Sequence, residues 1–301
     1  MLNITGKTRV IGVIGYPVSH SRSPQMHNAA IADLGLNFVY LPFNVKPQDL
    51  ADAIKGFKAQ QLVGVNVTIP HKQVVIPMVD QLSTQADLIG AVNTLIFEED
   101  QIYGHNTDAE GFIQAMEETL NSSQIELPSQ DIKVVVLGAG GAARAIIVAL
   151  ALNGATEIII ANRTIARAKH LIRDLGCKFS GLERMSQVQF KFAEINSEEL
   201  ANHISTSHLL VNTTSVGMIA SNEIDLFNLD ALSVRTVVYD IVYTPPVTAL
   251  MKAAQIRGCP TIGGIGMLVH QGSIAFQKWT NVVPNVSIMR QALLQPLGDS
   301  T

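Results

Sequence analysis

The sequence of 301 residues contains only two cysteines, Cys177 and Cys259, which lie far apart in the chain. Two isolated thiols exclude a small secreted scaffold held by disulfides and are typical of a protein in a reducing compartment. Charged residues are also scarce, at 15%, and the formal net charge is −4. This charge balance gives no reason to expect nucleic acid or an anionic membrane as a partner.

Membrane segments and metal-ligand clusters are missing as well. The apolar stretch at residues 10–16 is too short to span a bilayer, and the N-terminus lacks the features of a secretory signal. No histidine cluster has the spacing of metal ligands, and His203 and His208 are interpreted as surface or structural residues. We therefore expect a cytoplasmic enzyme without a metal.

Apolar residues, in contrast, are abundant. They make up 47% of a chain whose length suggests about two domains, so large cores can be buried.

The stretch at residues 133–145, KVVVLGAGGAARA, has the pattern of a buried strand, a glycine turn and a helix over 142–152. Gly138 suits the tight turn, and Gly140 lets the backbone approach a pyrophosphate at the helix N-terminus, with Ala143 in the third position. The pattern predicts a dinucleotide site. The alternative is a glycine-rich turn that binds nothing.

A second apolar strand at residues 157–161 ends in Asn162, Arg163 and Thr164, and Arg167 follows on the next helix. No acid is present where an NAD-binding protein holds the ribose 2′-hydroxyl, whereas arginine suits a 2′-phosphate. The two arginines therefore favour NADP. Taken singly, each is better explained as a solvated charge near a helix end.

Hydroxyl residues follow the first predicted strand, at residues 10–15. Ser19 and Ser21 are two apart, so in an extended segment their hydroxyls face the same way and suit a small anionic group such as a carboxylate. A serine-rich turn that caps its own backbone remains the alternative. Ser23 and Pro24 then mark the expected start of a helix.

Polar residues also lie near the end of the predicted strand at residues 63–69. Asn66 and Thr68 share one face of it, and Lys72 follows at the edge where open α/β sheets place ligands. Asp108 begins a later predicted helix. On these residues alone, Lys72 is also compatible with a surface lysine and Asp108 with a simple N-cap.

Several segments, taken together and in order, resemble shikimate dehydrogenase. They cover nearly the whole chain: GYPVSHS with Ser23-Pro24 and His27-Asn28, NVTIPHK at 66–72, IGAVNT at 89–94, NTD at 106–108, GAGGAAR at 138–144, NRT at 162–164, NTTSVGM at 212–218, Tyr239-Asp240 with Tyr243, and GIGMLV at 264–269 with Gln271. The sequence is accordingly identified as a member of this family.

The resemblance implies a catalytic pair, Lys72 and Asp108. It implies that the substrate carboxylate is held by Ser19 and Ser21, and that other substrate-binding residues are Asn66, Thr68, Asn93, Tyr243 and Gln271. His71, before the lysine, is a position at which many members carry an aromatic or other residue.

The resemblance also implies an NADP site. Its pyrophosphate end would be Gly138, Ala139, Gly140, Gly141 and Ala142, its adenosine end Asn162, Arg163, Thr164 and Arg167, and its nicotinamide end Ile241 and Gly264. Alcohol oxidation removes a hydride, which NADP accepts, and a proton, for which the Lys72–Asp108 pair supplies a relay.

The expected fold is α/β with two domains. A Rossmann-type NADP-binding domain spans 109–263, and a discontinuous substrate-binding domain with a mostly parallel sheet spans 1–108 and 264–301. The expected function is reversible, NADP-dependent reduction of 3-dehydroshikimate to shikimate in aromatic amino-acid biosynthesis, by a monomer or homodimer.

Three alternatives stay open. One is a quinate/shikimate dehydrogenase with relaxed NAD/NADP use, because the sequence does not show whether the pocket accepts the extra hydroxyl of quinate. A second is a non-catalytic NADP-binding regulator, which has no need of the Lys72–Asp108 pair. A third is a relative that acts on an amino analogue of the substrate.

Overall fold

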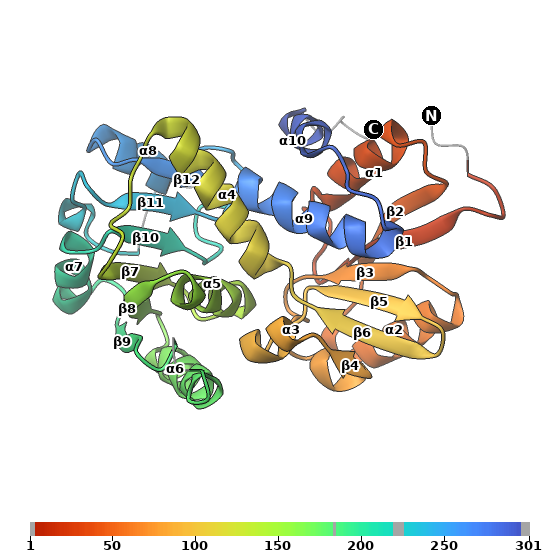
Figure 1. Cartoon of the computed structure of the whole chain (residues 1–301), viewed down its shortest axis with the longest axis horizontal. Coiled ribbons are helices and arrows are strands. Elements are labelled where there is room, and N and C mark those ends of the chain that lie inside the picture. Colours follow the sequence, from red (N-terminus) through yellow and green to blue (C-terminus); the bar gives the residue numbers. More distant parts are fainter. Residues whose placement is uncertain (1–3, 183–184, 219–225, 296–301) are drawn as a thin grey trace. The chain divides into compact units, whose positions relative to one another are not determined.

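The computed structural model describes residues 4–182, 185–218 and 226–295 and has the predicted α/β fold (Figure 1). The chain forms two compact units. Unit 1 comprises Met1–Gly111 and Leu268–Thr301, and unit 2 comprises Phe112–Met267. The chain passes from one unit to the other within two helices, α4 (Asp108–Ser123) and α9 (Gly264–Thr280).

Unit 1 contains a six-stranded mixed sheet in the order β2-β1-β3-β5-β6-β4. Three of its strand pairs are parallel and two, β3 with β5 and β5 with β6, are antiparallel. The strands are β1 (Arg9–Gly15), β2 (Phe38–Asn44), β3 (Gly64–Val67), β4 (Gln81–Leu82), β5 (Thr94–Glu98) and β6 (Gln101–His105), and the helices are α1 (Ser23–Asp33), α2 (Leu50–Ala59), α3 (Thr84–Ile89) and α10 (Val286–Leu294).

The C-terminal part of the chain completes the core of unit 1. The Trp279 indole Nε1 donates a hydrogen bond to the carbonyl oxygen of Leu95 on β5 at 3.0 Å, and both residues are buried. A β-carbon at Gly64 on β3 would collide with the Trp279 ring. Glycine is therefore required where the indole lies against the sheet.

Unit 2 contains a six-stranded, wholly parallel sheet in the order β12-β11-β10-β7-β8-β9. This is the doubly wound order 3-2-1-4-5-6, whose switch point lies between its first and fourth strands, here β7 and β10. The strands are β7 (Ile132–Leu137), β8 (Ala155–Ala161), β9 (Gln189–Ala193), β10 (Leu209–Asn212), β11 (Val237–Asp240) and β12 (Thr261–Gly263), and the helices are α5 (Gly141–Leu152), α6 (Ile165–Phe179), α7 (Glu198–Ser205) and α8 (Ala249–Ile256).

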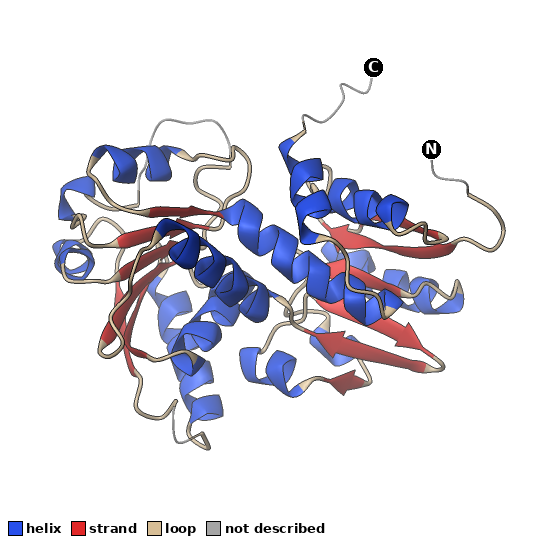
Figure 2. Ribbon diagram, turned by 45° about the horizontal axis from the view of Figure 1, so that its top comes forward, coloured by secondary structure: helices blue, strands red, loops and turns tan. Residues whose placement is uncertain are grey.

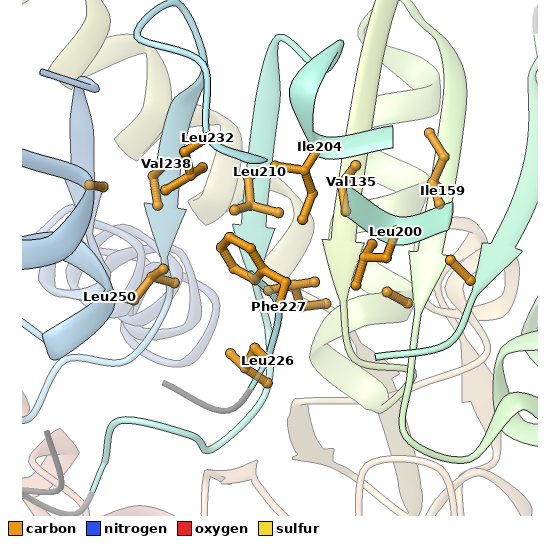
Figure 3. Close-up of a cluster of buried hydrophobic side chains, with 14 of the residues drawn as sticks. Val135, Ile159, Leu200, Ile204, Leu210, Leu226, Phe227, Leu232, Val238 and Leu250 are labelled. Atoms are coloured by element: carbon orange, nitrogen blue, oxygen red, sulfur yellow. The ribbon is translucent and has the colours of Figure 1, made fainter. Parts of the chain in front are cut away.

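Helices pack on the strands of this sheet, as Figure 2 shows in blue and red. On one face, side chains of neighbouring strands meet those of α7 and α8 in a core that Figure 3 draws: Val135, Ile159, Leu210, Val238, Leu200, Ile204 and Leu250. Val134, Val136, Ile158 and Ile160 are also fully buried, so both faces are covered, which explains the continuous apolar runs. Each such side chain contributes roughly 1.5–3 kcal/mol through burial.

Two further properties concern the described residues as a whole. No helix among them is both long and apolar enough to cross a membrane. Within the same part of the chain, no group of three or more His, Cys, Asp or Glu side chains is arranged to hold a metal ion.

The side chain of His27 on α1 is fully buried in unit 1. Its ring stacks on Tyr40, with 4.2 Å between centroids and 5° between planes, and it lies 6.0 Å from the ring of Phe276. Neither ring nitrogen has a hydrogen-bond partner among the described residues. Burial lowers the pKa of His27 to about 3, so the folded protein holds this imidazole neutral.

We predict that His27 makes the protein less stable in mild acid. Below pH 6.5 the unfolded chain binds a proton at this residue while the folded chain does not, so its contribution is lost as pH falls from 6.5 toward 3. Between pH 7 and pH 5 the loss is about 2 kcal/mol. Urea unfolding of the wild type and of His27→Phe at both pH values measures it, and equal losses in the two proteins would contradict the prediction.

Candidate active site

The centre of the site in unit 1 is an ion pair between the two residues predicted to be catalytic. Lys72 lies in the loop after β3 and Asp108 is the first residue of α4. The Lys72 Nζ contacts Asp108 Oδ2, and the two side chains are 15% and 6% exposed. The Lys72 carbonyl oxygen accepts the backbone N–H of Val92 at 2.8 Å, which fixes the loop. Asp108 therefore does more than begin a helix.

Asn93 holds the other oxygen of the carboxylate. Its Nδ2 donates to Asp108 Oδ1 and to Thr107 Oγ1, both at 2.9 Å. Its Oδ1 accepts the Thr107 backbone N–H at 2.8 Å. The Asn106 side chain accepts the backbone N–H of Asp108 at 3.0 Å. The Asn93 amide thus contacts the carboxylate oxygen that Lys72 does not contact.

Gln271 on α9 lies beside this group, with its Oε1 3.5 Å from Asn93 Nδ2. The Gln271 Nε2 donates to the Leu268 carbonyl at 2.8 Å. Gly111 on α4 allows this approach, because a β-carbon there would lie 2.5 Å from the Gln271 backbone nitrogen. Sequence reasoning missed Gly111, whose requirement arises only from the packing of two helices distant in sequence.

Asn66 lies on β3 and Thr68 directly follows it, and their side chains have different environments. Asn66 is buried, its Oδ1 accepts the Tyr40 hydroxyl at 2.7 Å, and its Nδ2 donates to the Asn93 carbonyl at 3.2 Å. Thr68 is half-buried and its backbone N–H binds the Ile14 carbonyl at 2.9 Å. Thr68 therefore has a partly accessible hydroxyl, whereas the amide of Asn66 is engaged within the protein.

The two serines lie in the loop after β1. Ser19 is exposed and Ser21 is half-buried. The Ser21 Oγ accepts the backbone N–H of Ser23 at 3.3 Å, so the turn does cap its own backbone. This bond uses one acceptor site of the hydroxyl and leaves its proton available. Among the described residues, no hydrogen bond joins either serine to the Lys72–Asp108 group.

His71, the residue before Lys72, is fully buried. Its Nε2 lies 2.7 Å from the Val45 carbonyl oxygen. The side chain thus ties the loop that carries Lys72 to the segment after β2.

The glycine turn of unit 2 lies at the carboxyl end of β7, beside the switch point. Gly138 has φ +111°, and a β-carbon there would lie 2.5 Å from Thr213 Oγ1. Gly140 has φ −93°, and a β-carbon there would meet nothing within 4 Å. Glycine at 140 is therefore not required by the protein's own packing, and the space beside it is open to a ligand.

Helix α5 begins at Gly141, directly after this turn. The first N–H groups of a helix have no acceptor within it and carry partial positive charge, so they suit a pyrophosphate. Ala139, Gly141 and Ala142 are half-buried, which leaves the backbone accessible. These residues fit the phosphate end of a dinucleotide.

The predicted adenosine end lies at the neighbouring strand, because the Gly138 N–H donates to the Ala161 carbonyl at 2.7 Å. Asn162 follows Ala161, and its Nδ2 donates to the Thr164 carbonyl at 2.9 Å. Arg163 and Arg167 are exposed, and neither has an ion pair with any described residue. Two guanidinium groups at this edge fit a 2′-phosphate.

Arg144, the last residue of the glycine motif, has another role. It is buried and forms an ion pair with Asp174 of α6, and burial lowers the pKa of its guanidinium. It joins α5 to α6 instead of facing the turn.

Ile241 and Gly264 are neighbours in unit 2, because a β-carbon at Gly264 would collide with the Ile241 carbonyl. Tyr243 is half-buried two residues further on. The segment is anchored by buried Asp240, which accepts the Thr248 hydroxyl at 2.7 Å and the Asn212 amide at 3.0 Å. Burial raises the pKa of Asp240, against the opposing effect of these hydrogen bonds.

Three family models match parts of the chain. Residues 13–95 match the model of the shikimate dehydrogenase substrate binding domain, residues 120–241 that of shikimate / quinate 5-dehydrogenase, and residues 264–294 that of the shikimate 5′-dehydrogenase C-terminal domain. A shikimate dehydrogenase (NADP(+)) of Methanopyrus kandleri is 42% identical over 98% of each chain.

The chain belongs to the shikimate dehydrogenase family. Solved structures support the same assignment. A shikimate dehydrogenase in complex with NADP+ is 40% identical and has a TM-score of 0.86 over 97% of this chain and 96% of its own. A quinate dehydrogenase from Corynebacterium glutamicum in complex with NAD is 31% identical, with a TM-score of 0.84 over 95% and 99%.

For this member of the shikimate dehydrogenase family we predict that Gly140→Ala separates cofactor binding from folding. The new methyl group enters open space, so the free energy of unfolding should change by less than about 1 kcal/mol, the scale of an N-cap change. It would occupy the approach to the pyrophosphate, so the Kd for NADP should rise at least about tenfold, which corresponds to ~1.4 kcal/mol.

The control is Gly176→Ala on α6, where a β-carbon also meets nothing within 4 Å. Calorimetric titration with NADP and urea unfolding give both quantities. Equal NADP affinity in the two variants would show that the turn at Gly140 does not hold the cofactor.

Proposed function

We propose that this protein catalyses the reversible, NADP-dependent reduction of 3-dehydroshikimate to shikimate, a step of aromatic amino-acid biosynthesis. The observation that carries the proposal is the shielded Lys72–Asp108 pair, held by Asn93 at the carboxyl edge of the unit 1 sheet. A protein that only binds a dinucleotide has no need of such a pair. The pair therefore argues against a non-catalytic regulator.

The substrate would be held by side chains around this pair. Ser19 and Ser21 supply hydroxyl donors for its carboxylate, and Thr68, Asn93 and Gln271 supply polar groups for its ring hydroxyls. The family resemblance adds Tyr243 to the substrate-binding residues. The site would select substrates whose ring hydroxyls pair with these polar groups. A substrate that lacks one of these hydroxyls would leave a polar group of the protein unpaired.

Lys72 and Asp108 would manage the proton. In the oxidation, the Lys72 side chain would pass one proton to Asp108 and take the proton of the substrate hydroxyl, so that the pair as a whole gains one proton. In the reduction, the Lys72 ammonium polarises the carbonyl as negative charge develops on oxygen, and then donates the proton. Asn93 keeps the carboxylate oriented toward the lysine in both directions.

NADP, when bound, accepts or supplies the hydride. The residues that would hold it are the turn at Gly138, Ala139, Gly140, Gly141 and Ala142, the segment Asn162, Arg163, Thr164 with Arg167, and Ile241 with Gly264. The relatives' names support this cofactor, since they are shikimate dehydrogenases (NADP(+)).

Absorbance at 340 nm tests the proposal directly, with shikimate or quinate as substrate and NADP or NAD as cofactor. Rapid reduction of NADP by shikimate, with little activity in the other three combinations, is the expected result. Absence of turnover in every combination, with NADP still bound, would favour the regulator or a different substrate.

A second candidate is a dehydrogenase that also accepts quinate. It is favoured by the shikimate / quinate 5-dehydrogenase model over residues 120–241 and by the similarity to a quinate dehydrogenase in complex with NAD. Comparable rates with quinate, or with NAD, would support this broader enzyme.

We expect Lys72→Ala to lower kcat by about 10²- to 10⁴-fold, the range for removing a positioned proton donor or acceptor. KM for shikimate should change much less, because the serines and the ring-binding residues remain. Lys55→Ala, at an exposed position on α2, is the matched control. Steady-state kinetics at saturating NADP measures both parameters, and a kcat near that of the wild type would refute the role of Lys72.

We also expect the double variant Arg163→Ala/Arg167→Ala to lose selectivity for NADP. Each guanidinium that contacts the 2′-phosphate supplies a charge-assisted hydrogen bond, so kcat/KM for NADP should fall by about tenfold or more while that for NAD stays nearly constant. Arg173→Ala, further along α6 and also exposed, should change neither value. An equal loss with both cofactors would contradict a 2′-phosphate contact.

A further inference from the structure

A chain of buried polar side chains connects strand β2 with the catalytic carboxylate. The Tyr40 hydroxyl donates to Asn66 Oδ1 at 2.7 Å, and Asn66 Nδ2 donates to Thr94 Oγ1 at 3.2 Å. The Thr94 hydroxyl donates to Asn93 Oδ1 at 2.9 Å, and Asn93 Nδ2 donates to Asp108 Oδ1 at 2.9 Å. All five residues are buried, so water does not compete for these bonds.

The orientation of the two asparagine amides in this chain of hydrogen bonds is fixed by backbone groups that only donate or only accept. Asn66 Nδ2 also faces the Asn93 backbone carbonyl, which only accepts, so Asn66 Oδ1 must face Tyr40. Asn93 Oδ1 faces the Thr107 backbone N–H, which only donates, so Asn93 Nδ2 must face Asp108.

These assignments determine which partner the Thr94 hydroxyl donates to and which it accepts from. Its proton points to Asn93 Oδ1, an oxygen without a proton, and its lone pair accepts from Asn66. Every donor in the chain therefore points toward Asp108. In a medium of low dielectric constant, hydrogen bonds in such a sequence polarise and strengthen one another.

We propose that Tyr40, Asn66 and Thr94 are positioning residues that hold the Asn93 amide against Asp108 Oδ1 and so leave Oδ2 directed at Lys72. This inference rests on the proposed function, in which the pair moves the substrate proton. It gives Asn66 a role in supporting the pair beside the contact with ring hydroxyls that the family resemblance implies.

A purely structural role makes a different prediction. Buried polar groups need partners in any protein, so loss of one hydroxyl would then lower stability and leave the chemistry of the folded molecules unchanged. A positioning role instead slows the chemical step and leaves substrate binding intact.

Tyr40→Phe and Thr94→Val each remove one link while nearly keeping the shape of the side chain. We expect the single-turnover rate of NADP reduction at saturating shikimate to fall about five- to tenfold in each, the equivalent of one hydrogen bond. KM for shikimate should stay within twofold. The solvent deuterium isotope effect should increase, because proton transfer through a poorly held pair becomes slower.

Tyr103→Phe is the matched control, since the Tyr103 hydroxyl donates to Gln101 Oε1 in an exposed position of the same sheet. It should leave the rate unchanged. The double variant Tyr40→Phe/Thr94→Val should be nearly as fast as Thr94→Val alone, because both changes interrupt one chain. A rate equal to the product of the two separate effects would overturn the inference.

Wild-type-like rates in both single variants, or losses that disappear after correction for the folded fraction, would also overturn the positioning role. These outcomes leave the proposed function standing, because wild-type turnover of shikimate is measured in the same series. Failure of the wild type to oxidise shikimate would instead overturn the proposed function together with the positioning role.

Discussion

The ion pair between Lys72 and Asp108, which is largely shielded from solvent, is the constraint on which the organisation of unit 1 depends. Removing two charges from water costs several kcal/mol per ion, and mutual attraction compensates only when further hydrogen bonds satisfy the remaining atoms. Asn93, which the chain from Tyr40 supports, meets this requirement at the second carboxylate oxygen. Polar side chains are therefore needed inside this edge of the sheet, because a charged pair is kept there away from solvent.

The parts of the molecule that were predictable depend on local signals. Gly138 and the helix after it follow from turn chemistry and apolar runs within about twenty residues, and the structure has the strand, turn and helix there. The polar run EEDQ at residues 98–101 is another local signal, because it turns the chain between the antiparallel strands β5 and β6. Lys72 and Asp108 were identified through a family resemblance, since neither residue carries a distinctive signal alone.

What escaped prediction depends on partners distant in sequence. The Tyr40 hydroxyl reaches Asn66, 26 residues away, and nothing in the sequence FVYLPFN distinguishes this tyrosine from a core aromatic residue. Likewise, Gly64 and Gly111 are required only because Trp279 and Gln271 pack against them. Strand β9, QFKFA, is largely exposed, so its apolar pattern is weak.

The packing of Trp279 against β5 also has a consequence for synthesis on the ribosome. The first 111 residues of unit 1 emerge well before Leu268, while the whole of unit 2, residues 112–267, is made in between. At about 5–20 residues per second this interval lasts roughly 8 to 30 s. During this interval the Trp279 indole is not yet present to pack against Gly64 and Leu95. Unit 2 is therefore able to fold before unit 1 is complete.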